Sequence, residues 1–162
     1  MRATASSKAL GFSFVELLTS LAILGLLASL ALPLAQVTVR RDKERELRRA
    51  LRDIRAGIDA YQAAAADGRI VSNQSANGYP TSLDELVIGV PNVKTEGAAT
   101  LYLLRRIPRD PFHPDKSIPA AETWGQRSFA SPPDAPLKGD DVFDVYSQSD
   151  QTGLNGVPYK EW

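Results

Sequence analysis

Two hydrophobic patterns follow one another along the first 66 residues of the chain. Residues 12–36 are predominantly apolar and carry a single charge, at Glu16, and a helix of this length spans the hydrocarbon core of a bilayer. Residues 37–66 keep a helical period but become amphipathic. Their apolar positions are Leu47, Leu51, Ile54, Ile58, Tyr61 and Ala65. The pattern predicts one helix from about residue 12 to residue 66, ended by Asp67-Gly68.

The remainder, residues 67–162, contains most of the glycines and nearly all of the prolines. This composition is typical of a small domain built from short elements joined by turns. We expect a short helix that ends near Ile88. A capping box opens it, with Ser82 as the N-cap residue and Glu85 three residues later.

Two short runs in the last third of the chain predict strands. They cover residues 124–130 and 142–146, and the proline-rich loop 131–139 separates them. Ninety or so residues form a sufficient core only when they pack against a further element. The predicted fold class is therefore α+β, with a long N-terminal helix whose second half packs against a small antiparallel sheet.

Composition narrows the possible functions. The 19 basic and 19 acidic side chains cancel, which argues against a dedicated nucleic-acid binder. The chain has no cysteine, so disulfides, CxxC redox chemistry and thiolate metal sites are excluded.

The N-terminus has the features of a targeting segment. Residues 1–11 contain Arg2 and Lys8 but no apolar stretch, which begins only after Gly11. If the segment is a secretory signal, a signal peptidase would cut near the small residues 28–31 and release the domain. If it is not cleaved, residues 12–36 would form a signal anchor. A carboxylate within a membrane helix costs roughly 2.5–3.5 kcal/mol on insertion scales, so Glu16 is expected to be functional.

The ordered combination of Gly11, the aromatic Phe12, Glu16 and the apolar run resembles the type III signal of the type IV pilin superfamily. The resemblance implies that prepilin peptidase removes the leader 1–11 by cleavage between Gly11 and Phe12, and that the new amine of Phe12 is methylated. It also implies that this amine pairs with Glu16 of a neighbouring subunit in a helical filament. Pro33 lies within the predicted helix, where proline removes a hydrogen bond and kinks the helix, and it resembles a proline of many pilin helices.

Three later segments are similar to the major (G-type) pseudopilin of type II secretion systems. They are Tyr79–Leu86, Leu101–Pro111 and Asp141–Ser147. The resemblance implies a pilin-like fold and a single-pass inner-membrane protein with its domain, residues 67–162, in the periplasm. It implies a short homo-oligomeric pseudopilus that drives protein export, with prepilin peptidase, the inner-membrane assembly platform, minor pseudopilins and the lipid bilayer as partners. No cofactor is required, and a separate cytoplasmic motor would consume ATP.

The chain departs from that family at two places. The family has a Trp-Gly pair directly after the Asp-Pro turn, whereas here Trp124-Gly125 lies well downstream. Many G-type subunits also bind calcium in an acidic C-terminal loop. Calcium takes six to eight oxygen ligands, so the one carboxylate of this loop, Asp150, with Asn155, forms at best a weak site. An ordinary turn region is the alternative.

The segment Arg40–Arg55 carries eight basic and four acidic residues. Most are expected to form a solvated helix face, and a few could form salt bridges between subunits. The positive-inside rule would place this flank in the cytoplasm, whereas the family resemblance places it outside.

Other functions remain as alternatives. A pilin of a type IV pilus or DNA-uptake filament shares the same N-terminal signal, and a minor pseudopilin at the filament tip is a further possibility. A lower alternative is a membrane-anchored periplasmic hydrolase that uses the only histidine, His113, with Asp110 or Asp115. A group of three further carboxylates could suggest a metal or acid–base site: Asp140, Asp141 and Asp144. The simpler expectation is a loop histidine, polar strand positions and no enzymatic activity.

Overall fold

The computed structural model describes residues 11–71, 77–95, 97 and 99–162. It divides into two compact units at residue 40. The predicted leader, apart from Gly11, and most of the polar loop around residue 74 lie outside the described residues. The fold class is α+β, as predicted, because one long helix is accompanied by short antiparallel strands.

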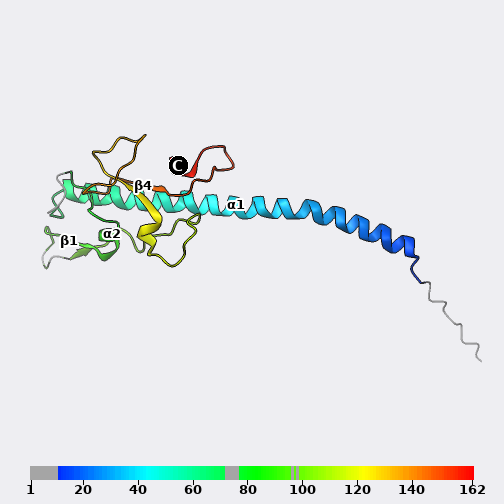
Figure 1. Ribbon diagram of the computed structural model, residues 1–162. Helices are drawn as coiled ribbons and strands as arrows, with labels where there is room; N and C mark the ends of the chain where they lie inside the picture. Colours follow the sequence, from blue (N-terminus) through cyan, green and yellow to red (C-terminus); the bar gives the residue numbers. More distant parts are fainter. Residues whose placement is uncertain (1–10, 72–76, 96, 98) are drawn as a thin grey trace, which may run out of the picture. The chain divides into compact units, whose positions relative to one another are not determined.

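The longest element is helix α1, Phe14–Ala66 (Figure 1). Its apolar half belongs to the first unit and most of its amphipathic half to the second. The hydroxyl groups of Thr19, Ser29 and Thr38 donate to main-chain carbonyls three or four residues earlier, at 2.7–3.0 Å. Such bonds satisfy hydroxyl groups without water, which a helix in hydrocarbon requires. The predicted helix over residues 12–66 is thus confirmed to within two residues.

The end of α1 is fixed by a glycine in the left-handed conformation. Gly68 has φ 65°, and its N–H donates to the Ala65 carbonyl while the N–H of Arg69 donates to that of Ala64, both at 2.9 Å. These two bonds form the Schellman motif, which satisfies carbonyl groups that the helix leaves without donors. The predicted stop at Asp67-Gly68 is confirmed.

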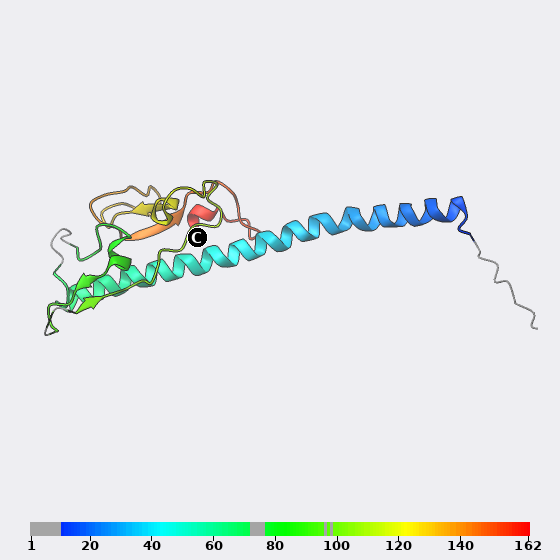
Figure 2. The ribbon, with the colours of Figure 1, turned by 90° about the horizontal axis from the view of Figure 1, so that it is seen from below.

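The amphipathic half of α1 supplies one wall of the core of the second unit. Every residue of the predicted stripe is buried except Ala65, which is partly buried. The opposite wall contains Ile70, Leu83, Leu86, Trp124, Val142, Val145 and Tyr159. Figure 2 shows strand β4 (Asp144–Ser147) and the short helix η2 (Tyr159–Glu161) along this part of α1. The predicted packing on the second half of the helix is therefore confirmed.

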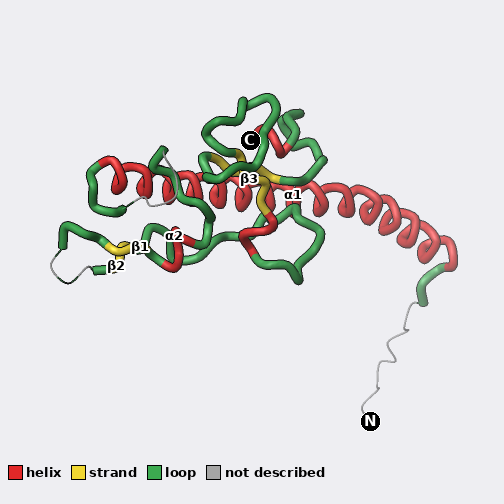
Figure 3. Tube along the Cα trace, turned by 60° about the vertical axis from the view of Figure 1, so that its left-hand side comes forward, coloured by secondary structure: helices red, strands yellow, loops and turns green. Residues whose placement is uncertain are grey.

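Helix α2, Glu85–Ile88, leads directly into strand β1, Val90–Pro91. β1 pairs antiparallel with β2, Thr100–Leu101 (Figure 3). Gly89 joins α2 to β1 with φ 87°, and a Cβ atom there would lie 2.5 Å from the Thr100 side chain. Glycine is therefore required at this junction.

The predicted N-cap of α2 is wrong. The helix begins after Asp84, which makes no capping hydrogen bond. The Glu85 carboxylate instead accepts from the N–H and the hydroxyl group of Thr81, one residue before the predicted Ser82. In a capping box the glutamate lies three positions after the cap. Here α2 is a single turn preceded by a tight turn, and the contact from Thr81 to Glu85 spans four positions.

The second strand pair consists of β3, Trp124–Arg127, and β4, Asp144–Ser147, which are antiparallel. Helix η1, Ala120–Thr123, precedes β3. β3 ends three residues earlier than predicted because the next N–H groups bond elsewhere: that of Ser128 donates to the Leu137 carbonyl, and that of Phe129 to the Asp141 carboxylate.

The prediction of one small sheet is wrong for the described part of the chain, which has two separate two-stranded sheets. Pro91 has no N–H to extend β1. The N–H groups of Leu103 and Leu104 both donate to the Leu86 carbonyl, at 3.1 and 2.8 Å. β2 therefore ends after two residues, and no ladder reaches β3.

Candidate functional site

The first unit exposes its apolar side chains. Described side chains from residue 11 to 29 and from 33 to 36 are all exposed, with Phe12 at 77% and Leu34 at 69%. This part of α1 is long and apolar enough to span a membrane. In water such a surface is unfavourable, since each large apolar side chain gains about 1.5–3 kcal/mol on burial.

The predicted processing site lies just outside this helix. Gly11 and Phe12 precede α1 and are exposed, and no atom lies within 4 Å of a Cβ position at Gly11. Glu16 lies in the first turn of α1, where the helix dipole favours a carboxylate. The structure therefore places the Gly11–Phe12 bond in accessible non-helical backbone, one turn before the only charge of residues 11–39.

Pro33 lies inside α1, and the chain stays helical on both sides of it. Proline has no N–H, so it cannot donate to the carbonyl of Ser29, four residues earlier. This is the one position of the apolar half at which the helical ladder lacks a donor.

In the second unit, a glutamate that the sequence analysis assigned to a solvated face is buried. Glu44 is only 7% exposed. Its Oε1 accepts the N–H of Leu154 at 2.7 Å and the hydroxyl group of Tyr159 at 3.0 Å. It thereby ties the C-terminal loop to α1. A sequence signal existed, because Glu44 precedes Leu47 and Leu51 at helical spacing and so lies on the apolar stripe.

The predicted calcium ligands lie in that loop. Asp150 is exposed, and the Asn155 side-chain oxygen accepts the N–H of Val157 at 3.1 Å. Within the described residues, no three or more histidine, aspartate or glutamate side chains gather as a metal site. Calcium binding at Asp150 and Asn155 stays a prediction.

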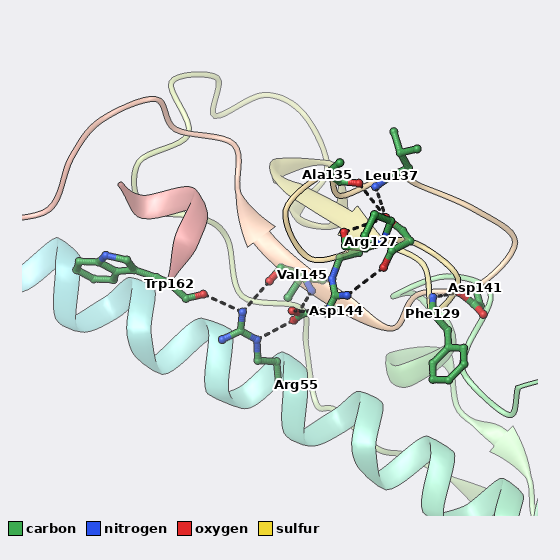
Figure 4. Close-up of polar contacts among 11 residues, drawn as sticks. Arg55, Arg127, Phe129, Ala135, Leu137, Asp141, Asp144, Val145 and Trp162 are labelled. Carbon is green, nitrogen blue, oxygen red and sulfur yellow. Dashed lines mark hydrogen bonds and ion pairs between the residues drawn. The ribbon is translucent and has the colours of Figure 1, made fainter. Parts of the chain in front are cut away.

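Arg55 forms the centre of a polar network between α1 and the C-terminal segment (Figure 4). Its guanidinium donates to Asp144 at 2.8 Å, to the carbonyl of Val145 at 3.2 Å and to the main-chain oxygen of Trp162 at 2.8 Å. Arg127 reaches the other Asp144 oxygen at 3.4 Å. The Asp144 carboxylate also accepts the N–H of Val145 at 2.7 Å. The outer edge of β4 is therefore satisfied by side chains rather than by a further strand.

Asp110, in the predicted Asp-Pro turn, is a structural centre. It is buried, and its carboxylate accepts the Ser147 hydroxyl group at 2.5 Å and the N–H of Phe112 at 2.8 Å. The indole N–H of Trp124 donates to the Pro108 carbonyl at 2.8 Å. Trp124 therefore lies beside this turn although it is 16 residues from Pro108 in sequence.

The candidate catalytic pairs are not assembled as the hydrolase alternative requires. The Nδ1 atom of His113 lies 3.1 Å from the main-chain oxygen of Asp115. The Asp115 carboxylate accepts two hydrogen bonds from Ser117, which lower the pKa of that carboxyl group. The Asp110 carboxylate, as described, is directed at other donors.

The three further carboxylates are likewise dispersed. Asp144 pairs with two arginines, and Asp141 is buried with its oxygens directed at Phe129 and Asn77. Asp140 is exposed. Asp141 and Asp144 thus hold strand and loop structure together.

The segment Tyr79–Leu86 contacts α1 through the side chain of Glu85. The phenol of Tyr61, on the buried stripe, contacts the Glu85 carboxylate. Burial, and secondly the charge and hydrogen bond of Glu85, raise the pKa of Tyr61 to about 12. Glu85 therefore joins three elements, because it also accepts from Thr81.

We compared the chain with protein-family models, with curated proteins and with solved structures, and none of them matches it.

Proposed function

We propose that this chain is a structural subunit of a filament of the type IV pilin kind, most similar to the major pseudopilin of type II secretion. Prepilin peptidase would cleave between Gly11 and Phe12 and leave the apolar half of α1 attached to the domain. That half would anchor the subunit in the inner membrane and then form the filament core. The filament would extend in the periplasm and move exported proteins across the outer membrane.

One observation carries the proposal. The core of the second unit contains no residue before Leu47, while the first unit leaves its large apolar side chains uncovered. Among the described side chains these are Phe12, Phe14, Val15, Leu17, Leu18, Leu21, Ile23, Leu24, Leu26, Leu27, Leu34 and Val39. Apolar surface of this extent marks contact with lipid or with another protein. A pilin-like subunit needs lipid around this surface while it is in the membrane and other subunits around it in the filament.

Glu16 would act in the same passage of the subunit from membrane to filament. A neighbour's N-terminal ammonium would neutralise its carboxylate within the apolar filament core, and breaking one side of a buried ion pair costs about 3–5 kcal/mol. We expect Glu16→Leu to insert and to be processed but to assemble poorly. Normal filaments formed by that variant in electron micrographs would contradict this role.

The decisive experiment is intact-mass analysis of the protein recovered from membranes with and without prepilin peptidase. A mature chain that starts at methylated Phe12, seen only with the peptidase, is the expected result. An unprocessed chain, or cleavage near residues 28–31, would overturn the proposal in favour of a signal anchor or a secreted domain. Among processed products, long surface fibres would indicate a type IV pilus in place of a short periplasmic filament.

Topology is tested separately, because the basic flank conflicts with the positive-inside rule. The chain has no cysteine, so a single cysteine at the exposed Ala130 gives a clean label site. We expect a membrane-impermeant maleimide to label Ala130→Cys in spheroplasts without lysis. Labelling only after lysis would place the domain in the cytoplasm and contradict the proposal.

A further inference from the structure

Three arginines are among the six residues that line a pocket in the second unit. It has a volume of about 310 Å³ and is formed by one face of α1 together with the C-terminal segment. Its lining residues are Arg48, Leu51, Arg52, Arg55, Asn155 and Trp162. Three of these residues are arginines and none is acidic. The volume is at the lower end of the range of small-ligand pockets.

The three arginines differ in their partners. Arg55 is neutralised by Asp144 at 2.8 Å. The guanidinium of Arg48 lies 4.3 Å from the ring centroid of Trp162, and among the described residues neither Arg48 nor Arg52 has a hydrogen bond or an ion pair. Like charges four residues apart on a helix repel. The pocket thus holds two cationic groups at a mutual cost, without an anion of the chain beside them.

The geometry suits a tetrahedral oxyanion. A guanidinium stacked on an indole ring keeps its in-plane N–H groups free, and these bind phosphate oxygens in pairs. The Asn155 side-chain oxygen is used by the N–H of Val157, so its amide N–H groups are available as further donors. The lining side chains therefore offer donors. Two full positive charges match inorganic phosphate or a phosphate monoester of charge −1.5 to −2 and also attract the single negative charge of a phosphodiester headgroup.

We propose that this pocket is a phosphate-binding site formed by Arg48, Arg52 and Asn155, with the Trp162 ring as its apolar wall. The ligand is a phosphate group, either free or carried by a phospholipid headgroup. Leu51 and the indole ring provide apolar surface for the group that carries the phosphate. The site is independent of the proposed filament function, since every residue of it lies in the second unit.

The test uses the full chain in micelles of a neutral detergent. Inorganic phosphate is added at constant ionic strength, and tryptophan fluorescence is recorded, because screening by salt alone would otherwise mimic binding. The chain has two tryptophans, and Trp162→Phe identifies which of them responds. We expect a saturable change that Trp162→Phe abolishes.

Two variants and a matched control locate the site. Arg48→Gln and Arg52→Gln remove charge but no hydrogen bond of the fold, so the domain should stay folded. Each is expected to weaken phosphate binding roughly tenfold or more, the factor typical of one lost charge-assisted hydrogen bond. Arg49→Gln removes an exposed arginine outside the pocket from the same helix and should leave the affinity unchanged.

Vesicles distinguish the two sources of phosphate. The full chain is reconstituted in phosphatidylcholine with or without phosphatidylglycerol. If a headgroup fills the site, phosphatidylglycerol changes Trp162 emission and free phosphate then adds nothing. If the ligand is free phosphate, emission responds to inorganic phosphate in both membranes. A lack of response in both arms, or an equal loss in Arg49→Gln and Arg52→Gln, would overturn the proposal.

Discussion

The two halves of α1 share one helical backbone but face different surroundings. In the apolar half, all the described side chains around the helix are exposed, and Glu16 is the one charge. In the amphipathic half, a stripe from Glu44 to Ala64 is buried while the remaining faces are charged. The comparison teaches that helix formation by itself does not require a packed core. The described side chains of the apolar half are uncovered, whereas the amphipathic half is covered by its own domain.

The largest contrast is expected between two isoleucines. Ile54 is fully buried and Ile23 is 54% exposed. In urea unfolding of the full chain in neutral detergent, Ile54→Ala should lower the free energy of unfolding by about 2–5 kcal/mol, because it leaves a cavity. Ile23→Ala should lower it by less than about 0.5 kcal/mol. A similar loss in both variants would mean that the domain depends on the apolar half after all.

Two glutamates sharpen the comparison. Glu44→Ala leaves the N–H of Leu154 and the hydroxyl group of Tyr159 without that acceptor, which should cost about 1–3 kcal/mol of unfolding free energy. Glu16→Ala should leave domain stability unchanged and reduce filament yield. Urea unfolding and filament counts by electron microscopy, applied to both variants, give the result. The comparison fails if Glu44→Ala reduces the filament yield or if Glu16→Ala lowers the stability of the domain.

Removing a polar contact between α1 and the rest of the domain should have a smaller effect on the free energy of unfolding. Arg55→Gln should lower the free energy of unfolding by about 1 kcal/mol, since the side chain is partly exposed and its ion pair is partly screened. Arg45→Gln breaks a pair with Asp42 whose side chains are 72% and 65% exposed. It should change stability by less than about 0.5 kcal/mol. Equal effects would show that exposure does not distinguish these arginines.

Alkaline pH should affect only the domain, because all five tyrosines follow residue 60. An unfolded tyrosine ionises near pH 10, whereas the pKa of Tyr61 is raised to about 12 by its burial and by Glu85. The stability that neutral Tyr61 contributes is present below about pH 10 and is lost as the pH rises to about 12. Urea unfolding across this range should show a steeper decline for the wild type than for Tyr61→Phe. Parallel curves would contradict this linkage.

Much of the fold was predictable because it depends on local chemistry. The buried stripe from Leu47 to Tyr61 follows from period 3.6, and the stop at Gly68 follows from the ability of glycine to adopt positive φ. The errors lie where contacts between distant segments decide. The capping-box spacing favours Ser82 by sequence, but it is the N–H of Thr81 that donates to the Glu85 carboxylate.

The candidate functional residues also fall into two groups, those singled out by the sequence pattern and those distinguished only by tertiary contacts. The sequence predicts roles for Gly11, Phe12 and Glu16 without reference to packing, because their pattern is contiguous. It treated Arg48, Arg52 and Arg55 as similar members of one charged face. All three line the pocket with Trp162, but Arg55 pairs with Asp144, whereas Arg48 and Arg52 have no ion pair among the described residues.

The sequence by itself determined where the chain is helical, where its helix stops and which half needs an apolar environment, because these depend on the spacing of neighbouring side chains. Only the tertiary structure decided which charges are buried, how short strands pair and where the arginines without partners gather. The burial and pairing of charges depend on contacts between residues about 90 to 115 positions apart, as from Arg55 to Asp144 and from Glu44 to Tyr159. The strands pair between residues 9 to 23 positions apart. No local period encodes such contacts.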